Sequence, residues 1–290
     1  MPLEYAYEAT GDLMKKGLLL ATIFTLLVSC NAQQGETAKI STVPASELAK
    51  LPMRWPSSRL PLKAYIGDTM LAEVTAEGED GNGHNIIEQM ENQWNLADPA
   101  RTYFDVNTLY TNTNLNYTDL NDYLDGEIGI YKSTNWFSFI GAGVLAVTSY
   151  IGENRGSYIL LNHADIIMNY RDYSFTNDSS NAFNYDLPSV MLHELGHMIG
   201  LKHAGSSVIP SVMQPTLGAA DSKRAVTPYD ISYITSNYNN ISALTAAPLA
   251  LTANGNSAPT YIHGYIELRA DGECRHYQAG KLVETHLHGL

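Results

Sequence analysis

The chain has 290 residues, of which 44% are hydrophobic and 16% are charged, and its formal net charge is -13. This composition is typical of a soluble globular protein with one sizeable domain plus appendages, or with two small domains. Because such an acidic surface repels phosphate backbones, nucleic acid is not an expected partner.

The first predicted element is an export signal at residues 14–29. Residues 1–13 precede it and are left out of the fold prediction. Lys15 and Lys16 give a positive start, and the apolar run at 17–29 is shorter than the ~20 residues that a transmembrane helix needs. The alternative is a buried amphipathic helix, but the run is apolar on every side and polar sequence follows it. We therefore expect an exported protein.

The signal ends in Leu27-Val28-Ser29-Cys30, which resembles the lipobox of bacterial lipoproteins. The resemblance implies that Cys30 is acylated and anchors the mature protein to a bacterial membrane, facing the periplasm or the cell surface. The polar residues 30–52 then serve as a tether. Cys274 is the other cysteine of the chain, so a lipidated Cys30 leaves no intramolecular disulfide to support the fold.

A folded domain is predicted over residues 53–242. A helix should follow the turn at 79–83, because apolar residues recur on one helical face from Ile86 to Trp94. The Asn/Thr/Tyr-rich stretch at 107–124 is expected to be a loop. Strands are predicted at 60–67, 103–106, 127–132, 143–150 and 158–169.

Two further helices are predicted, followed by a β-rich tail. The first runs over 187–200, with Pro188 in its first turn and Gly200 ending it in a left-handed conformation. The second begins at Thr227, which caps it, and reaches about Tyr238. Residues 243–290 are predicted to hold a linker, at 247–260, and a small hairpin, at 265–284. This order of elements indicates an α+β fold.

The sequence HELGHMIGLKH, residues 193–203, contains three of the nine histidines. On a helix, His193 and His197 lie one turn apart on the same face, which suits two nitrogens each about 2.0–2.1 Å from one Zn²⁺. Gly200 breaks the helix and lets the chain return, so that His203 supplies a third ligand. Glu194 lies beside the metal without pointing at it, which suits a group that holds a zinc-bound water. The alternative is a set of surface histidines without metal.

These residues resemble the HExxHxxGxxH signature of the metzincin zinc metallopeptidases. SVMQP, residues 211–215, is similar to the metzincin Met-turn and implies that Met213 lies beneath the zinc site. The Ser-Val-Met-x-Pro form and the later helix PYDISYITSNY resemble the matrixin-like (matrix metalloprotease-like) branch. The resemblance implies a twisted mixed sheet with an active-site helix and a C-terminal helix. Some other metzincins carry a tyrosine ligand where this chain has Pro215, so none is assigned.

The resemblance and the residues agree on peptide-bond hydrolysis at one catalytic zinc. Zinc lowers the pKa of its bound water and polarises the scissile carbonyl, while Glu194 takes the proton of that water and passes it to the departing amine. The histidine and aspartate pattern of the second, structural zinc site of matrixins is absent, and His163 is interpreted as an ordinary strand residue. Calcium occurs in this family, but no loop motif here indicates a site for it.

A protein or peptide substrate should lie extended along an exposed sheet edge. The candidate edge is 143–150, where Val144, Leu145, Ala146 and Val147 would lie nearest the cleft; the alternative is a plain buried strand. Pro215 and the rest of the loop at 214–229 should shape the pocket beyond the scissile bond. We expect a monomer.

Two other hypotheses stay open. The chain could be a surface-anchored binding or adhesion lipoprotein that uses a metzincin-like scaffold and binds through its C-terminal segment, although the intact glutamate argues against lost catalysis. The tail could also inhibit the enzyme, if Cys274, His286 or His288 occupied the open position of the zinc.

Overall fold

The computed structural model describes residues 51–205, 209–239, 260–271 and 273–287. All of these belong to one unit, residues 38–290. The predicted signal at 14–29, Cys30 and nearly all of the tether lie outside the described residues, as does most of the linker. The predicted domain boundaries therefore stay predictions.

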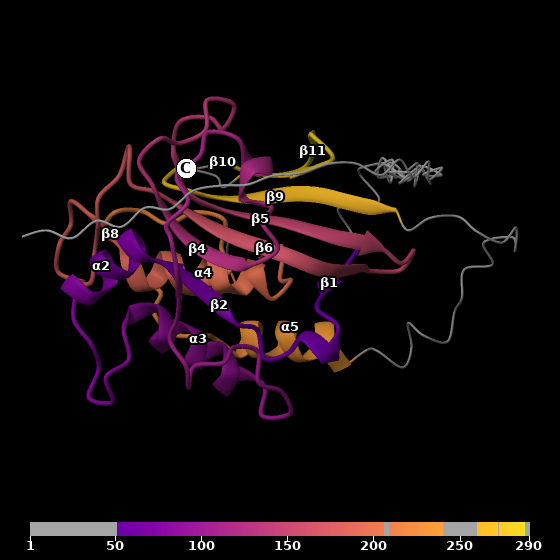
Figure 1. The fold of residues 1–290 in the computed structure, drawn as a ribbon, viewed down its shortest axis with the longest axis horizontal. Coiled ribbons are helices and arrows are strands. Elements are labelled where there is room, and N and C mark those ends of the chain that lie inside the picture. Colours follow the sequence, from indigo (N-terminus) through magenta and orange to yellow (C-terminus); the bar gives the residue numbers. More distant parts are fainter. Residues whose placement is uncertain (1–50, 206–208, 240–259, 272, 288–290) are drawn as a thin grey trace, which may run out of the picture. The chain divides into compact units, whose positions relative to one another are not determined.

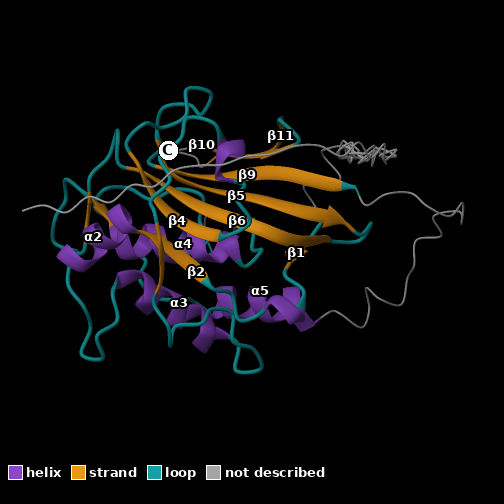
Figure 2. Ribbon diagram, viewed as in Figure 1, coloured by secondary structure: helices purple, strands orange, loops and turns teal. Residues whose placement is uncertain are grey.

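A mixed sheet of nine strands organises the described part of the chain (Figure 2). The strand order is β11-β10-β9-β5-β6-β4-β2-β3, and β1 pairs with β6. Strands β1, β2, β3, β4 and β6 pair in parallel, whereas β5, β9, β10 and β11 join antiparallel. The bounds are β1 Met53–Arg54, β2 Ala64–Gly67, β3 Tyr110–Asn112, β4 Ile128–Ser133, β5 Val144–Asn154, β6 Ile159–Asn169, β9 Tyr261–Arg269, β10 Glu273–Gln278 and β11 Lys281–Leu287. A separate pair consists of β7 (Phe175–Thr176) and β8 (Tyr185–Asp186).

The described residues form four α-helices: α2 Asp68–Ala76, α3 Ile86–Ala97, α4 Leu187–Met198 and α5 Pro228–Asn239. Figure 1 shows α3, α4 and α5 on the same side of the sheet, with α4 next to the strands. Asn85 and Glu88 start α3 with a capping box, in which each side chain binds the backbone N–H of the other residue. The main apolar core fills the space between these helices and the sheet.

Neighbouring residues of β5 and β6 contribute to two different apolar clusters. Ala146 and Ile166 belong to the main core with α4, whereas Val147 and Ile167 belong to a second cluster that contains Tyr123. Because successive strand residues point to opposite faces, both faces of the central strands are buried. This double burial explains the nearly continuous apolar sequence of both strands.

Helix α4 is buried along its whole length. Asp186 caps it by accepting a hydrogen bond from the Ser189 N–H. At the other end, the Trp55 indole donates to the Met198 carbonyl at 2.7 Å, and the Tyr238 hydroxyl donates to the Ile199 carbonyl at 2.9 Å. A helix fixed at both ends in this way is a rigid platform for the side chains that it carries.

The α+β prediction is confirmed, with four differences in detail. Residues 107–124, which were expected to be a loop, contain β3 and a short 3-10 helix at Leu120–Tyr123, because elements this short carry no clear periodic signal. Residues 103–106 form no strand and contribute only an isolated bridge between Leu62 and Phe104. Helix α2 was not predicted because Met70 and Val74 are its only buried residues, which is a weak periodic signal. The C-terminal tail is larger than the expected separate hairpin, because β9, β10 and β11 extend the main sheet.

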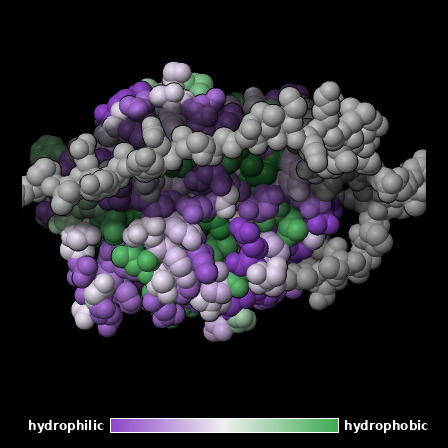
Figure 3. All heavy atoms as spheres, viewed as in Figure 1, coloured by the Kyte–Doolittle hydropathy of each residue, from purple (hydrophilic) through white to green (hydrophobic). Residues whose placement is uncertain are grey.

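The searched, described residues contain no helix long and apolar enough to cross a membrane. On the face drawn in Figure 3, hydrophobic residues lie in small patches among hydrophilic ones.

Candidate metal centre

Three buried histidines meet at the end of α4. His193 and His197 project from one face of the helix, and the chain turns back after Gly200 to bring His203 to them. One ring nitrogen from each lies within 4.8 Å of the others. The ring centroids are 4.5 Å apart for His193 and His197, 4.7 Å for His197 and His203, and 5.3 Å for His193 and His203. The three rings can therefore share one ion.

Backbone carbonyls fix which nitrogen of two of these rings faces the centre. His193 Nδ1 lies 2.8 Å from the Val212 carbonyl oxygen, and His197 Nδ1 lies 2.8 Å from that of Leu201. A carbonyl only accepts hydrogen bonds, so each Nδ1 carries the proton and each Nε2 presents a lone pair. His193 Nε2 is buried without a hydrogen-bond partner, and His197 Nε2 lies 3.1 Å from His203 Nε2. The Nε2 lone pairs of His193 and His197, with His203 Nε2 beside them, fit a metal cation such as Zn²⁺.

Burial sets the charge state that metal binding requires. It lowers the pKa of His193 to about 3, because the buried site disfavours the imidazolium, and the nearby Lys223 acts in the same direction while the Val212 carbonyl opposes the shift. His193 is therefore neutral at physiological pH. The neutral imidazole is the form that coordinates a metal.

Glu194 follows the first histidine and is fully buried. The Thr148 hydroxyl on β5 donates a hydrogen bond to its Oε2, while its Oε1 has no hydrogen-bond partner. Burial raises the pKa of Glu194 to about 8, and the bond from Thr148 opposes that shift. A cation bound to the neighbouring histidines would favour the carboxylate. One oxygen is thus anchored to the sheet, and the other is available to a water molecule.

Asp230 on α5 supports the centre from behind. Its carboxylate accepts hydrogen bonds from the Ser211 hydroxyl and, at 3.1 Å, from the Val212 N–H. The carbonyl of that same Val212 accepts from His193. Asp230 also receives the Thr227 N–H at 2.8 Å, which ties the turn to the start of α5. The fully buried carboxylate of Asp230 therefore helps to orient His193 indirectly, through the peptide groups of Val212.

Met213 packs beneath α4 at Gly196, between the two helical histidines. A Cβ at Gly196 would lie 2.3 Å from Met213 Sδ and 2.8 Å from Trp94 Cζ2, so only glycine allows this approach. The Met213 carbonyl accepts the Ala204 N–H at 2.8 Å, directly after His203. The turn that holds Met213 is therefore bonded to the segment that returns the third histidine.

The sequence model of the matrixin family matches residues 69–239, which is more than half of the chain. The chain belongs to the matrixin family. It is thus a member of a family of zinc metallopeptidases, and its histidine cluster can hold a metal ion. No curated protein is similar enough in sequence to match it.

The structure of this matrixin brings the sequence-predicted ligands together but leaves no exposed edge at β5. His193, His197 and His203 converge, with Glu194 beside them and Met213 below. The expectation of an exposed edge at 143–150 is wrong for this conformation. Val144, Ala146 and Val147 pair with residues of β9, and Leu145 is fully buried. The edge is covered because β9, a strand of the C-terminal tail, pairs with β5 on the side that was expected to be exposed.

Pro215 also contacts the C-terminal tail, because its carbonyl accepts a hydrogen bond from the Arg269 N–H of β9 at 3.2 Å. His163 is buried, and its Nε2 lies 2.6 Å from Asp165 Oδ2, so it is an internally bonded strand residue. The side chains of Cys274 and His286 and the whole of His288 lie outside the described part of the chain.

Sequence reasoning missed three contributors to the site. Thr148 gave no signal because a threonine in a strand is ordinary, and its role depends on the packing of α4 against β5. Gly196 lies inside the motif but at a position that the HExxH pattern leaves open. Asp230 lies at the start of a helix, where the sequence alone indicates no more than a charge favoured by the helix dipole, and its bond to Val212 is a tertiary contact.

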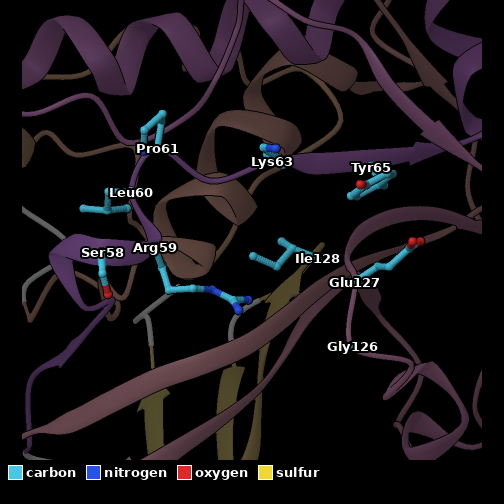
Figure 4. A pocket seen from close by; sticks show the side chains of 9 residues that line it. All are labelled: Ser58, Arg59, Leu60, Pro61, Lys63, Tyr65, Gly126, Glu127 and Ile128. Carbon is cyan, nitrogen blue, oxygen red and sulfur yellow. The ribbon is translucent and has the colours of Figure 1, made fainter.

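Another pocket, of about 340 Å³, lies at the starts of β2 and β4 (Figure 4). It contains none of the three histidines, and we assign it no role. Its lining residues are Ser58, Arg59, Leu60, Pro61, Lys63, Tyr65, Gly126, Glu127 and Ile128.

Replacing Asp230 with asparagine should weaken metal binding about 10–100-fold, because His193 loses its indirect support. Competition with a calibrated zinc chelator measures this change. Asp122→Asn, at an exposed residue of a short 3-10 helix, is the matched control and should bind metal as the wild type does. Unchanged metal affinity in a folded Asp230→Asn variant would contradict the supporting role.

Proposed function

We propose that this chain is a zinc-dependent endopeptidase that hydrolyses peptide bonds within proteins, with Glu194 as general base. The observation that carries the proposal is the convergence of three buried imidazoles within 4.8 Å of one another, beside a buried carboxylate. His193, His197 and His203 would hold the ion. Membership of the matrixin family supports the same reading.

The residues divide the chemistry between them. When bound, Zn²⁺ supplies a Lewis acid that lowers the pKa of water and polarises the scissile carbonyl. Glu194 accepts a proton from the attacking water through its unpartnered Oε1 and later delivers that proton to the departing amine. Thr148 holds the other oxygen, so the carboxylate keeps its direction during both transfers. Burial excludes bulk water that would compete for the proton.

The substrate is proposed to be an extended protein segment that pairs with β5 on one side and with the 215–217 segment on the other. Both segments border the centre: β5 carries Thr148, and Thr216 and Leu217 line the same small pocket as His193. Main-chain pairing of this kind accepts many sequences, and the pocket would select the side chain.

No observation on the described residues favours the alternative of a binding or adhesion lipoprotein. Its supposed binding module, the C-terminal tail, is bonded to the catalytic sheet. Export and lipid anchoring at Cys30 remain our proposal on the basis of sequence alone. An intact, unacylated Cys30 in protein extracted from the producing cell would contradict the anchor.

Removal of the metal should abolish proteolysis and leave the chain able to regain it. We expect a zinc chelator to stop the cleavage of a peptide library, and one equivalent of Zn²⁺ to restore it. Cleavage sites are identified by mass spectrometry, before and after reconstitution. Cleavage that continues in protein shown by elemental analysis to be free of metal would contradict the proposal.

A further inference from the structure

Strand β9 covers the outer edge of β5 along almost its whole length. The antiparallel register runs from Val144 opposite Arg269 to Glu153 opposite Tyr261. Figure 1 shows β9, in yellow, lying directly beside β5. Because β6 binds the other edge of β5, the main chain of this strand has no free side for another peptide over that register.

The end of β9 is also held by the loop that follows the third histidine. The Arg269 N–H donates to the Pro215 carbonyl at 3.2 Å, and the Leu217 N–H donates to the Arg269 carbonyl at 3.0 Å. Arg269 thus forms a parallel bridge with Thr216 while it faces Val144 on the other side. This part of the tail therefore lies extended between the two segments that the proposed function assigns to a substrate.

Leu268 places an apolar side chain next to the metal centre. It is almost fully buried and lines the same small pocket as His193. Val212, whose carbonyl orients His193, and Leu217 line that pocket too. A leucine of the tail therefore forms part of the wall of the pocket beside His193, where the side chain of a bound substrate would be recognised.

The next strand of the tail is fixed to β5 as well. The Tyr150 hydroxyl accepts a hydrogen bond from Gln278 Nε2 at 2.7 Å and lies 2.8 Å from His276 Nε2. All three side chains are buried. Because Tyr150 belongs to β5 and its two partners belong to β10, the tail is attached by buried side chains as well as by its main chain.

We propose that strands β9 and β10 inhibit this matrixin from within, with β9 taking the place of a substrate on β5 and Leu268 closing one side of the small pocket beside His193. The inference rests on the proposed function. It differs from a block of the metal by a tail cysteine or histidine, because the contacts are made by main-chain groups and by a leucine. A substrate must displace β9 before it can pair with β5. The competing interpretation is that β9 is a permanent structural strand.

The test uses the full chain loaded with zinc and a library of short peptides as substrates. Leu268→Asp puts a charge into an apolar pocket, which should loosen β9 and raise Glu194-dependent cleavage about ten-fold or more. Leu282→Asp is the matched control, because Leu282 is 49% exposed on β11, and it should leave cleavage unchanged. Zinc content and circular dichroism establish that each variant is folded.

A second version of the test does not depend on how well the Leu268 variant folds. The full chain receives a recognition sequence for an unrelated protease within the predicted linker at 247–260, and is cut there. The tail then lacks its tether, so cleavage per molecule should rise on dilution and fall again when a synthetic peptide of residues 260–287 is added. A permanent structural strand would give no such rise.

The outcomes separate the two proposals. Equal Glu194-dependent cleavage by the wild type, the Leu268 variant and the cut chain at every dilution would overturn the inhibition and leave the peptidase standing. If none of these zinc-loaded forms shows cleavage that depends on Glu194, the proposed function fails, and the inference fails with it.

Discussion

Replacing Glu194 with alanine should lower the rate of peptide cleavage about 10²–10⁴-fold while zinc stays bound. Glu194 is the buried carboxylate beside the three histidines, and its free Oε1 is the group assigned to accept the proton of the attacking water. Alanine removes that base but leaves the three imidazoles in place. The measurement is the rate of library cleavage together with the zinc content of each protein.

Glu73→Ala is a matched control for this loss, because Glu73 lies on α2 and pairs with Lys132. It should cleave at the wild-type rate. Both substitutions are compared in the wild-type and the Leu268→Asp backgrounds, so that a covered cleft does not hide the difference. A zinc-loaded Glu194→Ala protein that cleaves as fast as its parent would remove Glu194 from the mechanism.

Replacing Gly200 with alanine should destabilise the fold by about 3 kcal/mol or more. The residue has φ +95°, which costs energy for any residue with a Cβ, and that Cβ would lie 2.2 Å from the Met53 carbonyl oxygen. The clash is with the backbone of β1, so it cannot be relieved by rotating a side chain. Urea unfolding of the metal-free protein measures the loss, and zinc affinity should fall as well because His203 is displaced.

Gly78→Ala separates the cost of a positive φ from the cost of the clash with β1, both of which apply to Gly200→Ala. Gly78 has φ +98°, but nothing lies within 4 Å of its Cβ position. Its substitution therefore carries the conformational cost without the clash and should be the milder of the two. Equal losses at both positions would show that contact with β1 does not fix the turn that returns His203.

The sequence predicted the centre well because its geometry is local. His193, Glu194 and His197 lie within two turns of one helix, and a glycine followed by three residues suffices to return His203. Helix capping at Asp186 and Thr227 also depends on neighbouring residues alone. Such features follow from spacing and backbone preference, so no long-range pairing had to be known.

The features that the sequence did not predict depend on long-range pairing. The support of Glu194 by Thr148 requires α4 to lie against β5, and the reach of Asp230 to Val212 joins residues from different elements. The pairing of β9 with β5 is the most extensive of these long-range features. The turn signals at 265–284 predicted a hairpin in the tail, but they do not say which strand of the main sheet it joins.

The most direct test of the account is X-ray absorption at the zinc edge of the purified full chain, combined with elemental analysis. We expect one zinc per chain, with three imidazole nitrogens about 2.0–2.1 Å from the metal, and the loss of one nitrogen ligand in His203→Ala. Zinc well below one equivalent after reconstitution, or a spectrum that His203→Ala leaves unchanged, would contradict a metal centre built from His193, His197 and His203.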